Sequence, residues 1–400
     1  MNLSVQNFRS IKDETFDLAP ITVFYGPNGS GKSTVLYSLL TFKNIVLNPN
    51  QQVSGFFNYG FMNLGGFESV VFDHRKSKEI LFKFELGGFE NSVSHEVKFG
   101  QSAGTFSLKV FPDSLKTPLQ IHAEVTFPYP LNQASIGEAD FKKGGSTKVT
   151  WNGIDTKQVS GTTGYETFFP GIQELANKVS SCLRNVVMVP LKRGFSKPSY
   201  SSIPVTPLLA TEDEIATMLS TDKYLVAKIS SYLESITGRD FRLNVQPGTA
   251  VFSLDALDKR TGIASELVNE GFGINQLVHM LARCLVPDAS IVCVEEPEIH
   301  LHPSAVRALA QSYVKMTKEE DRSFVVATHS EVFISTMLAE IARGAMKPND
   351  LSCYLVTKDG KASKFEKQEV NEKGQISGGL QAFAQAELEN TKILLGISDE

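Results

Sequence analysis

Four residues near the N-terminus have the types and spacing that bind phosphate groups. Gly26, Gly31, Lys32 and Ser33 fit the pattern G-x-x-x-x-G-K-[ST], the Walker A pattern. In this pattern, glycines let backbone N–H groups point at phosphate oxygens, the lysine reaches the β- and γ-phosphates, and the serine hydroxyl ligates Mg²⁺. The sequence therefore predicts a nucleoside triphosphate site made by Gly26, Pro27, Asn28, Gly29, Ser30, Gly31, Lys32, Ser33 and Thr34.

Two consecutive carboxylates follow an apolar run much later in the chain. Ile291–Val294 reads as a buried strand, and Glu295 and Glu296 come directly after it in the stretch SIVCVEEPEIHLHP. Such a pair can hold Mg²⁺ through water with one acid and polarise the water that attacks the γ-phosphate with the other. We predict that Glu295 and Ser33 bind the metal ion and that Glu296 and Lys32 are catalytic residues. Neighbouring strand residues point to opposite faces, so the turn must re-aim Glu296.

Two further segments have polar groups where a nucleotide could meet them. The strand in FVVATHS ends at Thr328 and His329, and His329 could donate a hydrogen bond to the γ-phosphate. The stretch VNEGFGINQL (residues 268–277) has two glycines and Asn269 ahead of a helix that we expect to begin near Ile274. Backbone N–H groups at a helix N-terminus form another anion cradle.

The elements that must position these residues alternate between strands and helices. A strand at 21–25 precedes the Walker A loop, and apolar residues at helical spacing follow it. From residue 276 the pattern predicts helices over 276–285, 304–317 and 331–343, and strands over 290–294, 324–328 and 352–356. This alternation predicts an α/β fold with a doubly wound, mainly parallel sheet.

The middle of the chain differs from its two ends. Residues 68–165 are rich in strand patterns, including SVVFD, EILFKFEL and IHAEVTF, while 171–184 and 211–237 have helical periodicity. We expect one ATPase-like domain split in sequence, with an antiparallel β lobe and a helical subdomain inserted. Its predicted parts are 1–64 (Walker A), 65–265 (inserted lobes) and 266–400 (second half).

Composition restricts the location and the partners. The 400 residues are 42% hydrophobic with a formal net charge of −5, so no global basic field draws the chain to nucleic acid. The first residues resemble no signal peptide, and no apolar run is long enough for a membrane span, which predicts a cytoplasmic protein. The four cysteines lack C-x-x-C spacing and are expected to be reduced: Cys182, Cys284, Cys293 and Cys353.

With these motifs in this order, the chain resembles the ABC-type ATPases of the SMC, RecF and OLD group, and within it the compact prokaryotic AAA-family ATPases. The resemblance covers residues 1–64 and 266–360 well and the middle poorly. It implies ATP and Mg²⁺ as cofactors and ATP hydrolysis as the reaction. It also implies that Arg9, in NFRSIKD, lies near the nucleotide.

The resemblance further implies a head-to-tail homodimer with two ATPs at the interface, with higher oligomers left open. Asn269 and Gly271 occupy the signature position, where the group usually has Ser before the Gly, and they would contact the ATP bound by the other subunit. Glu295 stands where Asp is more usual. No Q-loop is evident, although Gln51 or Gln52 could serve. His300 and His302 are interpreted as structural or interfacial.

Neighbouring families differ in recognisable ways. A transporter ATPase would carry an LSGGQ-like signature, a long-armed SMC protein would carry hundreds of heptad residues, and an OLD nuclease would add a C-terminal Toprim domain. None of these is expected in this sequence, which has 71 residues after His329.

The leading hypothesis is an ATPase that dimerises around ATP and switches or powers a partner effector, such as a nuclease, in DNA repair or defence against foreign DNA. The alternative is an ATP-dependent DNA-binding clamp of the RecF type, and a transporter subunit ranks third. DNA contact would need a local patch, for which Phe141–Gly153 and Pro190–Tyr200 are the two basic stretches with aromatic residues nearby.

Overall fold

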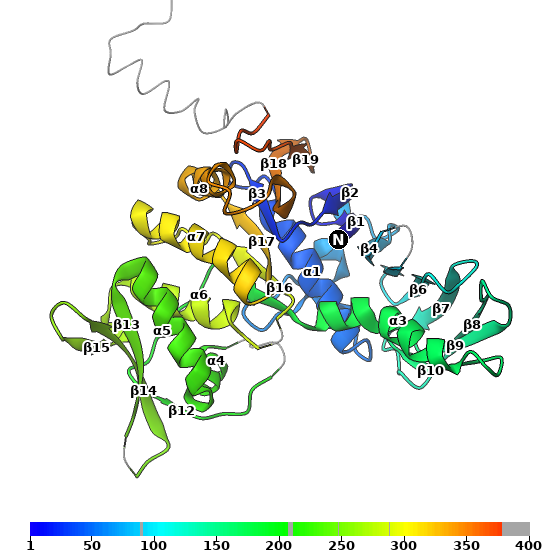
Figure 1. The fold of residues 1–400 in the computed structure, drawn as a ribbon, viewed down its shortest axis with the longest axis horizontal. Helices are drawn as coiled ribbons and strands as arrows, with labels where there is room; N and C mark the ends of the chain where they lie inside the picture. Colours follow the sequence, from blue (N-terminus) through cyan, green and yellow to red (C-terminus); the bar gives the residue numbers. More distant parts are fainter. Residues whose placement is uncertain (89–90, 207–210, 247, 288, 378–400) are drawn as a thin grey trace, which may run out of the picture. The chain divides into compact units, whose positions relative to one another are not determined.

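The computed structural model describes residues 1–377 except 89–90, 207–210, 247 and 288 (Figure 1). Its contacts divide the chain into two compact units, which are described separately. Unit 1 comprises Met1–Leu18, Thr34–Val186 and Gly360–Ser363, and unit 2 comprises Ala19–Ser33, Val187–Asp359 and the chain from Lys364 onward. The domain boundaries predicted at 64/65 and 265/266 stay a prediction, and residues 378–400 of the predicted second half lie outside the described residues.

The main sheet of unit 2 has six strands in the order β11-β16-β17-β3-β18-β19. Within this sheet, the pairs β16–β17, β17–β3 and β3–β18 are parallel. The strands are β11 (Val186–Val189), β16 (Ile291–Glu295), β17 (Ser323–Thr328), β3 (Ile21–Tyr25), β18 (Leu351–Asp359) and β19 (Ala362–Gln368).

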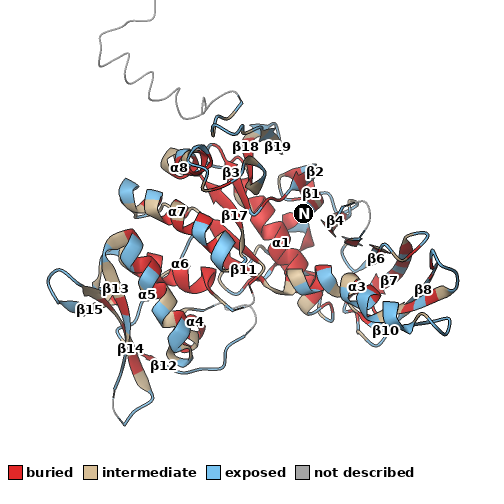
Figure 2. Cartoon of the chain, in the orientation of Figure 1, coloured by how far each residue is buried: buried red, intermediate tan, exposed pale blue. Residues whose placement is uncertain are grey.

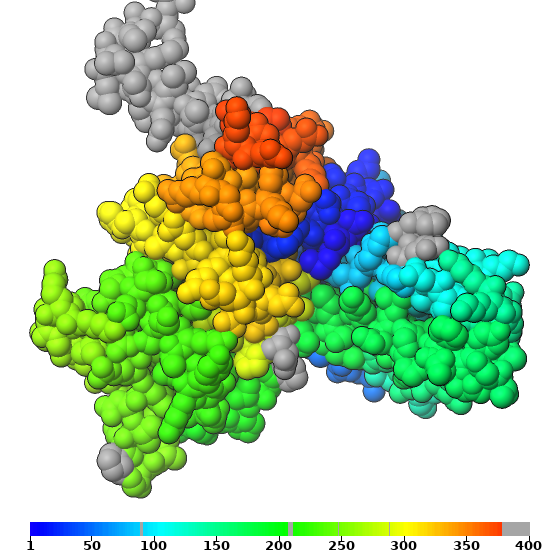
Figure 3. Space-filling view, in the orientation of Figure 1, coloured from blue at the N-terminus to red at the C-terminus, as the bar shows by residue number. Residues whose placement is uncertain are grey.

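Helices connect the parallel strands of this sheet. α7 (Pro303–Glu319) lies between β16 and β17 in the chain, and α8 (Glu331–Ala342) lies between β17 and β18. The two helices pack against each other, and their surfaces adjoin in yellow and orange in Figure 3. Strands buried on both faces read as continuous apolar runs, and all five residues of β3 are buried (Figure 2). The predicted fold class is confirmed in this sheet and its crossover helices.

The rest of unit 2 combines helices with a small antiparallel sheet. α5 (Lys223–Thr237) packs against β13, α6 and α7. The other elements are α4 (Glu212–Thr221), α6 (Phe272–Cys284), β12 (Tyr200–Ser201), β13 (Arg239–Val245), β14 (Val251–Asp258), β15 (Ala264–Glu266) and the 3₁₀ helices η4 (Leu267–Asn269) and η5 (Pro348–Asp350).

The helix predicted over 211–237 is two helices. Asp222 has extended backbone angles (φ −121°, ψ 92°) and its side chain accepts a hydrogen bond from Leu225 N, so it ends α4 and caps α5. The apolar residues Leu225, Ile229 and Leu233 of α5 are buried, but Tyr224 is 71% exposed. Tyr224 lies at the start of α5, where its ring contacts the Lys228 ammonium instead of the core.

Unit 1 is dominated by antiparallel strands. Six of them form a sheet in the order β2-β1-β4-β5-β6-β7, and three form a second sheet, β10-β9-β8. Their bounds are β1 (Asn2–Phe8), β2 (Ile11–Asp17), β4 (Ile80–Leu86), β5 (Ser92–Phe99), β6 (Ala103–Phe111), β7 (Leu119–Thr126), β8 (Ser135–Asp140), β9 (Ser146–Trp151) and β10 (Thr156–Gly161). The predicted β-rich lobe is therefore present.

The helices of unit 1 lie among these sheets. α3 (Phe169–Arg184) packs against β4, β5, β6 and β10. α1 (Lys32–Leu47) starts in unit 2 and continues in unit 1. The short helices are η1 (Val53–Phe57), α2 (Phe67–Val70), η2 (Phe72–His74) and η3 (Glu166–Phe168).

The strand predicted for SVVFD is wrong. Its residues belong to the end of α2 and to η2, separated by Val71. The apolar residues Val70, Val71 and Phe72 are buried as the pattern indicated, but a left-handed Asp73 (φ 59°) stops the chain from extending.

None of the helices in the described part of the chain is long and apolar enough to cross a membrane.

Candidate active site

The Walker A loop joins β3 to α1. Gly26 has φ 145°, and a Cβ atom at this position would lie 2.2 Å from the Val356 carbonyl oxygen, so only glycine fits. The Lys32 ammonium donates hydrogen bonds to the carbonyl oxygens of Gly26 (3.0 Å) and Pro27 (3.1 Å). Lys32 is buried and Ser33 partly buried in the first turn of α1, whereas Pro27, Asn28 and Gly29 form the exposed tip of the loop.

Strand β16 delivers the two adjacent carboxylates at its carboxyl end. Glu295 is the last strand residue and is 8% exposed. Glu296 has a left-handed backbone (φ 46°), which is uncommon for a residue with a side chain, and its N–H donates to the Ala327 carbonyl oxygen at 2.8 Å. The chain therefore leaves the strand direction at Glu296, as the alternation of strand side chains required.

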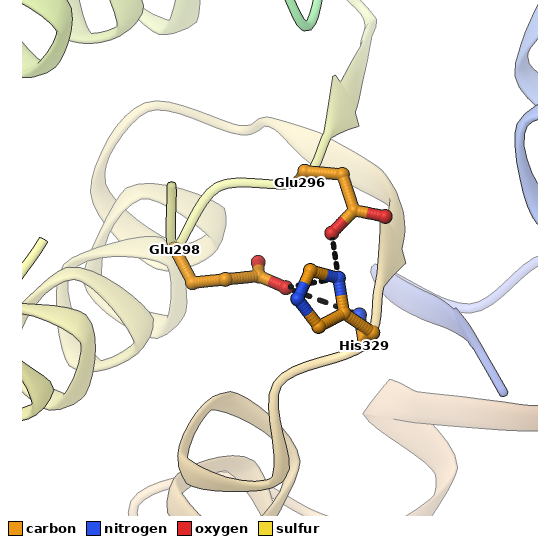
Figure 4. A group of neighbouring side chains, drawn as sticks. All are labelled: Glu296, Glu298 and His329. Atoms are coloured by element: carbon orange, nitrogen blue, oxygen red, sulfur yellow. Dashed lines mark hydrogen bonds and ion pairs between the residues drawn. The ribbon is translucent and has the colours of Figure 1, made fainter. Parts of the chain in front are cut away.

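His329 lies between two carboxylates (Figure 4). Its Nδ1 atom forms an ion pair with Glu296 and lies 3.4 Å from Glu298 Oε1. Glu298 Oε1 also accepts hydrogen bonds from the Thr328 hydroxyl (2.7 Å) and from His329 N (3.0 Å). Glu298 thus fixes the end of β17 that carries His329. The sequence analysis missed Glu298, although it is the third acid of EEPE.

Burial and neighbouring charges shift the pKa values of Glu296 and Lys32. Burial, followed by the nearby Glu298 carboxylate, raises the pKa of Glu296 to about 7, while His329 and Lys32 oppose the rise. Burial lowers the pKa of Lys32, and the carboxylates of Glu296, Glu298 and Glu295 oppose that change. Lys32 and the acidic cluster therefore act on each other electrostatically, which agrees with one common site. A group with a pKa near 7 is well matched to accept a proton near neutral pH.

Arg193 is a second residue that the sequence analysis missed. It lies in Pro190–Tyr200, which was weighed as a DNA-binding loop, but it is buried and donates to main-chain carbonyls of the segment that carries Glu295 and Glu296. Lys197, from the same stretch, pairs with Asp213 at 2.7 Å. Part of this basic stretch is therefore used inside unit 2.

The signature segment forms the start of α6, two residues earlier than predicted. Gly271 caps the helix, Phe272 begins it, and Gly271 is exposed with no atom within 4 Å of a Cβ built on it. Asn269 is exposed in η4, and its side-chain amide donates to Glu266 Oε2 at 3.0 Å. Gly273 is enclosed, because a Cβ there would lie 2.6 Å from the His300 carbonyl oxygen.

Arg9 and Thr34 belong to unit 1, so their positions relative to the loop residues of unit 2 are not described. Arg9 is exposed with a left-handed backbone (φ 50°), and its guanidinium carbon lies 5.3 Å from the centre of the Tyr37 ring. Thr34 is buried, and its hydroxyl lies 3.4 Å from the Ser10 hydroxyl. The roles of both residues at a nucleotide stay a prediction.

The oxygen atoms available near the loop fit a hard cation bound together with a nucleotide. The Ser33 hydroxyl, at the start of α1, and the Glu295 carboxylate, at the end of β16, are ligands that Mg²⁺ prefers. Glu296, Glu298 and His329 form a separate cluster whose ligand atoms all lie within 4.8 Å of one another. None of the four cysteines, all of which lie among the described residues, forms a disulfide, and Cys284, Cys293 and Cys353 are buried.

Two family models match the chain. One, described as "AAA ATPase domain", matches residues 1–96. The other, described as "AAA domain, putative AbiEii toxin, Type IV TA system", matches residues 225–335. The first match contains the Walker A loop, and the second contains the signature segment, the acidic pair and His329.

A curated relative is the OLD nuclease of Thermus scotoductus, which is 22% identical over 370 residues. The alignment covers 87% of this chain and 62% of the relative, so the chain spans less than two thirds of that protein's length.

Among solved structures, similar chains include an SMC head bound to the C-terminal winged-helix domain of ScpA (TM-score 0.47, 14% identity, 92% of this chain and 97% of that one). The SMC head domain of Thermotoga maritima has a TM-score of 0.40 and 11% identity, covering 92% of this chain and 98% of that one.

The family models and the OLD nuclease relative confirm the resemblance to ATPases that the motifs indicated. Residues 1–96 and 225–335 of this chain therefore match AAA-type ATPase domains, which supports ATPase activity.

Proposed function

We propose that this ATPase dimerises head-to-tail around Mg²⁺-ATP and uses hydrolysis to switch a partner effector, a nuclease, in DNA repair or defence against foreign DNA. The observation that supports the catalytic part is the partly buried Glu296, which pairs with His329 directly after the carboxyl end of β16. In an open α/β sheet, ligands bind at that end of the strands.

In the proposed reaction, Glu296 accepts a proton from the attacking water, because its pKa of about 7 leaves a large carboxylate fraction at neutral pH. Lys32 faces the β- and γ-phosphates, and His329 donates to the γ-phosphate. Ser33 and Glu295 would hold Mg²⁺, which neutralises phosphate charge when it is bound. Glu298 holds His329 in place through the contacts with Thr328 Oγ1 and His329 N.

The dimer is supported by the exposure of the signature segment. Asn269 and Gly271 are exposed at the N-terminal end of α6, where backbone N–H groups and the helix dipole favour an anion. A second subunit could therefore present its ATP to this end of the helix. The nuclease effector is supported by the name of the curated relative, an OLD nuclease.

Glu296→Gln tests the catalytic proposal. The amide is nearly isosteric, so ATP binding should persist, whereas removing a positioned base costs about 10²–10⁴ in rate. The variant should accumulate as a longer-lived dimer with Mg²⁺-ATP, measured by light scattering after size exclusion. Glu295→Gln is the comparison, because weaker Mg²⁺ retention should lose both dimer and turnover. Wild-type turnover in Glu296→Gln, or the same behaviour in both variants, would show that the roles of this pair are wrong.

The effector has its own test. Proteins that co-purify with Glu296→Gln in the presence of ATP should cleave duplex DNA, and cleavage should be lost when ATP is omitted. Material without ATP-dependent cleavage contradicts a nuclease effector and leaves the ATPase proposal intact.

A further inference from the structure

The left-handed turn at Glu296 is held by one buried guanidinium group. Arg193 Nη1 donates to the carbonyl oxygens of Glu295 (2.7 Å) and Pro190 (3.1 Å), and Nη2 donates to the carbonyl oxygen of Glu296 (2.7 Å). Arg193 is 8% exposed and lies about a hundred residues before the acids it contacts. The planar fork of arginine can bind two successive carbonyls at once, which a single lysine ammonium matches poorly.

These contacts fall on the backbone of the two acids and not on their carboxylates. Glu296 has φ 46°, a conformation that costs free energy for a residue with a side chain and persists only where the surroundings fix it. The carbonyls of Glu295 and Glu296 belong to the two peptide units on either side of the Glu296 Cα atom. By binding both, Arg193 fixes the backbone direction from which the Glu296 side chain leaves the chain. Arg193 therefore contacts the segment of the proposed base through main-chain atoms.

The loop that carries Arg193 is also tied to the signature segment. Asn275, in α6, accepts a hydrogen bond from Phe195 N (2.7 Å) and donates to the carbonyl oxygens of Phe195 (2.8 Å) and Leu267 (2.9 Å). Gly194, between the two contact points, has φ 126°, and a Cβ there would lie 3.0 Å from Asn275 Oδ1. A continuous set of buried hydrogen bonds thus joins η4 and α6 to the turn at Glu296.

We propose that Arg193 is a positioning residue for ATP hydrolysis, which holds the backbone of Glu295 and Glu296 so that Glu296 is aimed at its water, and that Asn275 connects this clamp to the signature segment. The proposal rests on the proposed role of Glu296 as the base. It assigns a catalytic consequence to the Pro190–Tyr200 stretch in place of DNA contact.

A matched control exists at the other end of the same strand. Arg322 donates to the carbonyl oxygens of Val286 (2.9 Å) and Ala289, which precede β16. Arg322→Met and Arg193→Met both remove a guanidinium that binds two or three main-chain carbonyls. Both should lower thermal stability, since carbonyls lose their donors. Only Arg193→Met should change the chemistry.

The test measures steady-state ATP turnover per folded protein. Arg193→Met should lower kcat on the order of 10²-fold with KM nearly unchanged, because a misplaced catalytic group can cost that much. Arg193→Lys should fall between Arg193→Met and wild type, and Arg322→Met should keep the wild-type kcat. Equal kcat losses in the two methionine variants would overturn the proposal, as would a wild-type kcat in Arg193→Met.

The double variant Arg193→Met/Glu296→Gln separates this inference from the proposed function. If Arg193 acts through Glu296, the double variant should be no slower than Glu296→Gln alone in a single-turnover assay. A further slowing by the full single-variant factor would overturn the positioning role while leaving Glu296 as the base. Wild-type turnover in Glu296→Gln alone would instead overturn the proposed function.

Asn275→Ala completes the design. This substitution removes the three hydrogen bonds that join the loop to α6 and η4. If Asn275 acts through Arg193, the double variant Asn275→Ala/Arg193→Lys should lose less kcat than the product of the two single losses. When Asn275→Ala is combined with Arg322→Lys instead, the effects of the two substitutions on kcat should be independent. Independence of Asn275→Ala from Arg193→Lys would contradict the connection to the signature segment.

Discussion

At the scale of single residues, the protonation of Glu296 determines when the proposed base can work. Burial and the Glu298 carboxylate both favour its protonated form and raise its pKa to about 7. His329 pairs with the Glu296 carboxylate and opposes this shift. Only the carboxylate can accept a proton, so activity is present above the pKa of Glu296 and is lost as the pH falls through it.

The first prediction is therefore an acid limb near pH 7 in the pH profile of kcat/KM for Mg²⁺-ATP, because kcat/KM reports the pKa values of the free enzyme. Glu298→Gln removes the like charge that raises the pKa of Glu296, so the limb should move to lower pH. The variant should also lose some maximal rate, because Glu298 fixes His329. Glu319→Gln, a change at an acid whose side chain is 55% exposed on α7, is the matched control and should leave the limb in place. A limb that stays at its wild-type pH in Glu298→Gln would contradict this account of the cluster.

At the scale of the elements, the N-terminus of α6 contains two glycines with opposite surroundings. Gly271 is the open N-cap, whereas Gly273 lies in the first turn with the His300 carbonyl oxygen against the place of its missing Cβ. His300 is itself left-handed (φ 60°) and its ring lies beside Phe272, with 5.6 Å between ring centres. The segment after the acidic pair therefore packs directly on the start of the signature helix.

Gly273→Ala should destabilise the protein by about 1–3 kcal/mol, the usual cost of forcing an extra carbon into a packed site. The gain in helix propensity from alanine offsets only part of this cost. Gly271→Ser should change the free energy of unfolding by less than about 0.5 kcal/mol, since serine is a good N-cap and the space is open. Urea unfolding followed by circular dichroism measures both values, and equal stabilities would show that the packing against His300 has no energetic weight.

Elements with strong local patterns could be predicted from the sequence, and those set by distant contacts could not. Short apolar runs predicted β3, β16 and β17, because strands that are buried on both faces are apolar along most of their length. The prediction of a strand over residues 69–73 is wrong. The pattern correctly indicated buried apolar residues, but it carries no signal for the left-handed backbone of Asp73. The Walker A, acidic and histidine motifs were found from spacing. Arg193 was not, because its partners are backbone carbonyls about a hundred residues away and carry no sequence signal.

At the scale of the whole molecule, the proposed catalytic groups of unit 2 come from segments far apart in the chain. Lys32 follows β3, Glu296 follows β16 and His329 follows β17, and these three strands are neighbours in the order β16-β17-β3. The parallel arrangement places their carboxyl ends at one edge of the sheet. The N-terminal end of α6 is exposed in the same unit, so in the proposed dimer one subunit would offer both the nucleotide-binding edge of the sheet and a surface for a second copy.

The last prediction tests that second copy. Gly271→Asp would place a carboxylate against the γ-phosphate presented by the other subunit, and like charges at an interface cost several kcal/mol. Asp is a favourable N-cap with a charge that suits the helix dipole, so the isolated subunit should stay folded and bind ATP. Gly271→Asn is the control, because asparagine has nearly the same size and N-cap preference as aspartate without the charge.

The measurement uses the Glu296→Gln background, which should trap the dimer. There, Gly271→Asp should weaken ATP-dependent dimerisation by more than about 10²-fold relative to Gly271→Asn, because each 1.4 kcal/mol is about tenfold. Sedimentation with Mg²⁺-ATP measures both constants. Equal dimerisation of the Asp and Asn variants would place the dimer contact somewhere other than the signature segment.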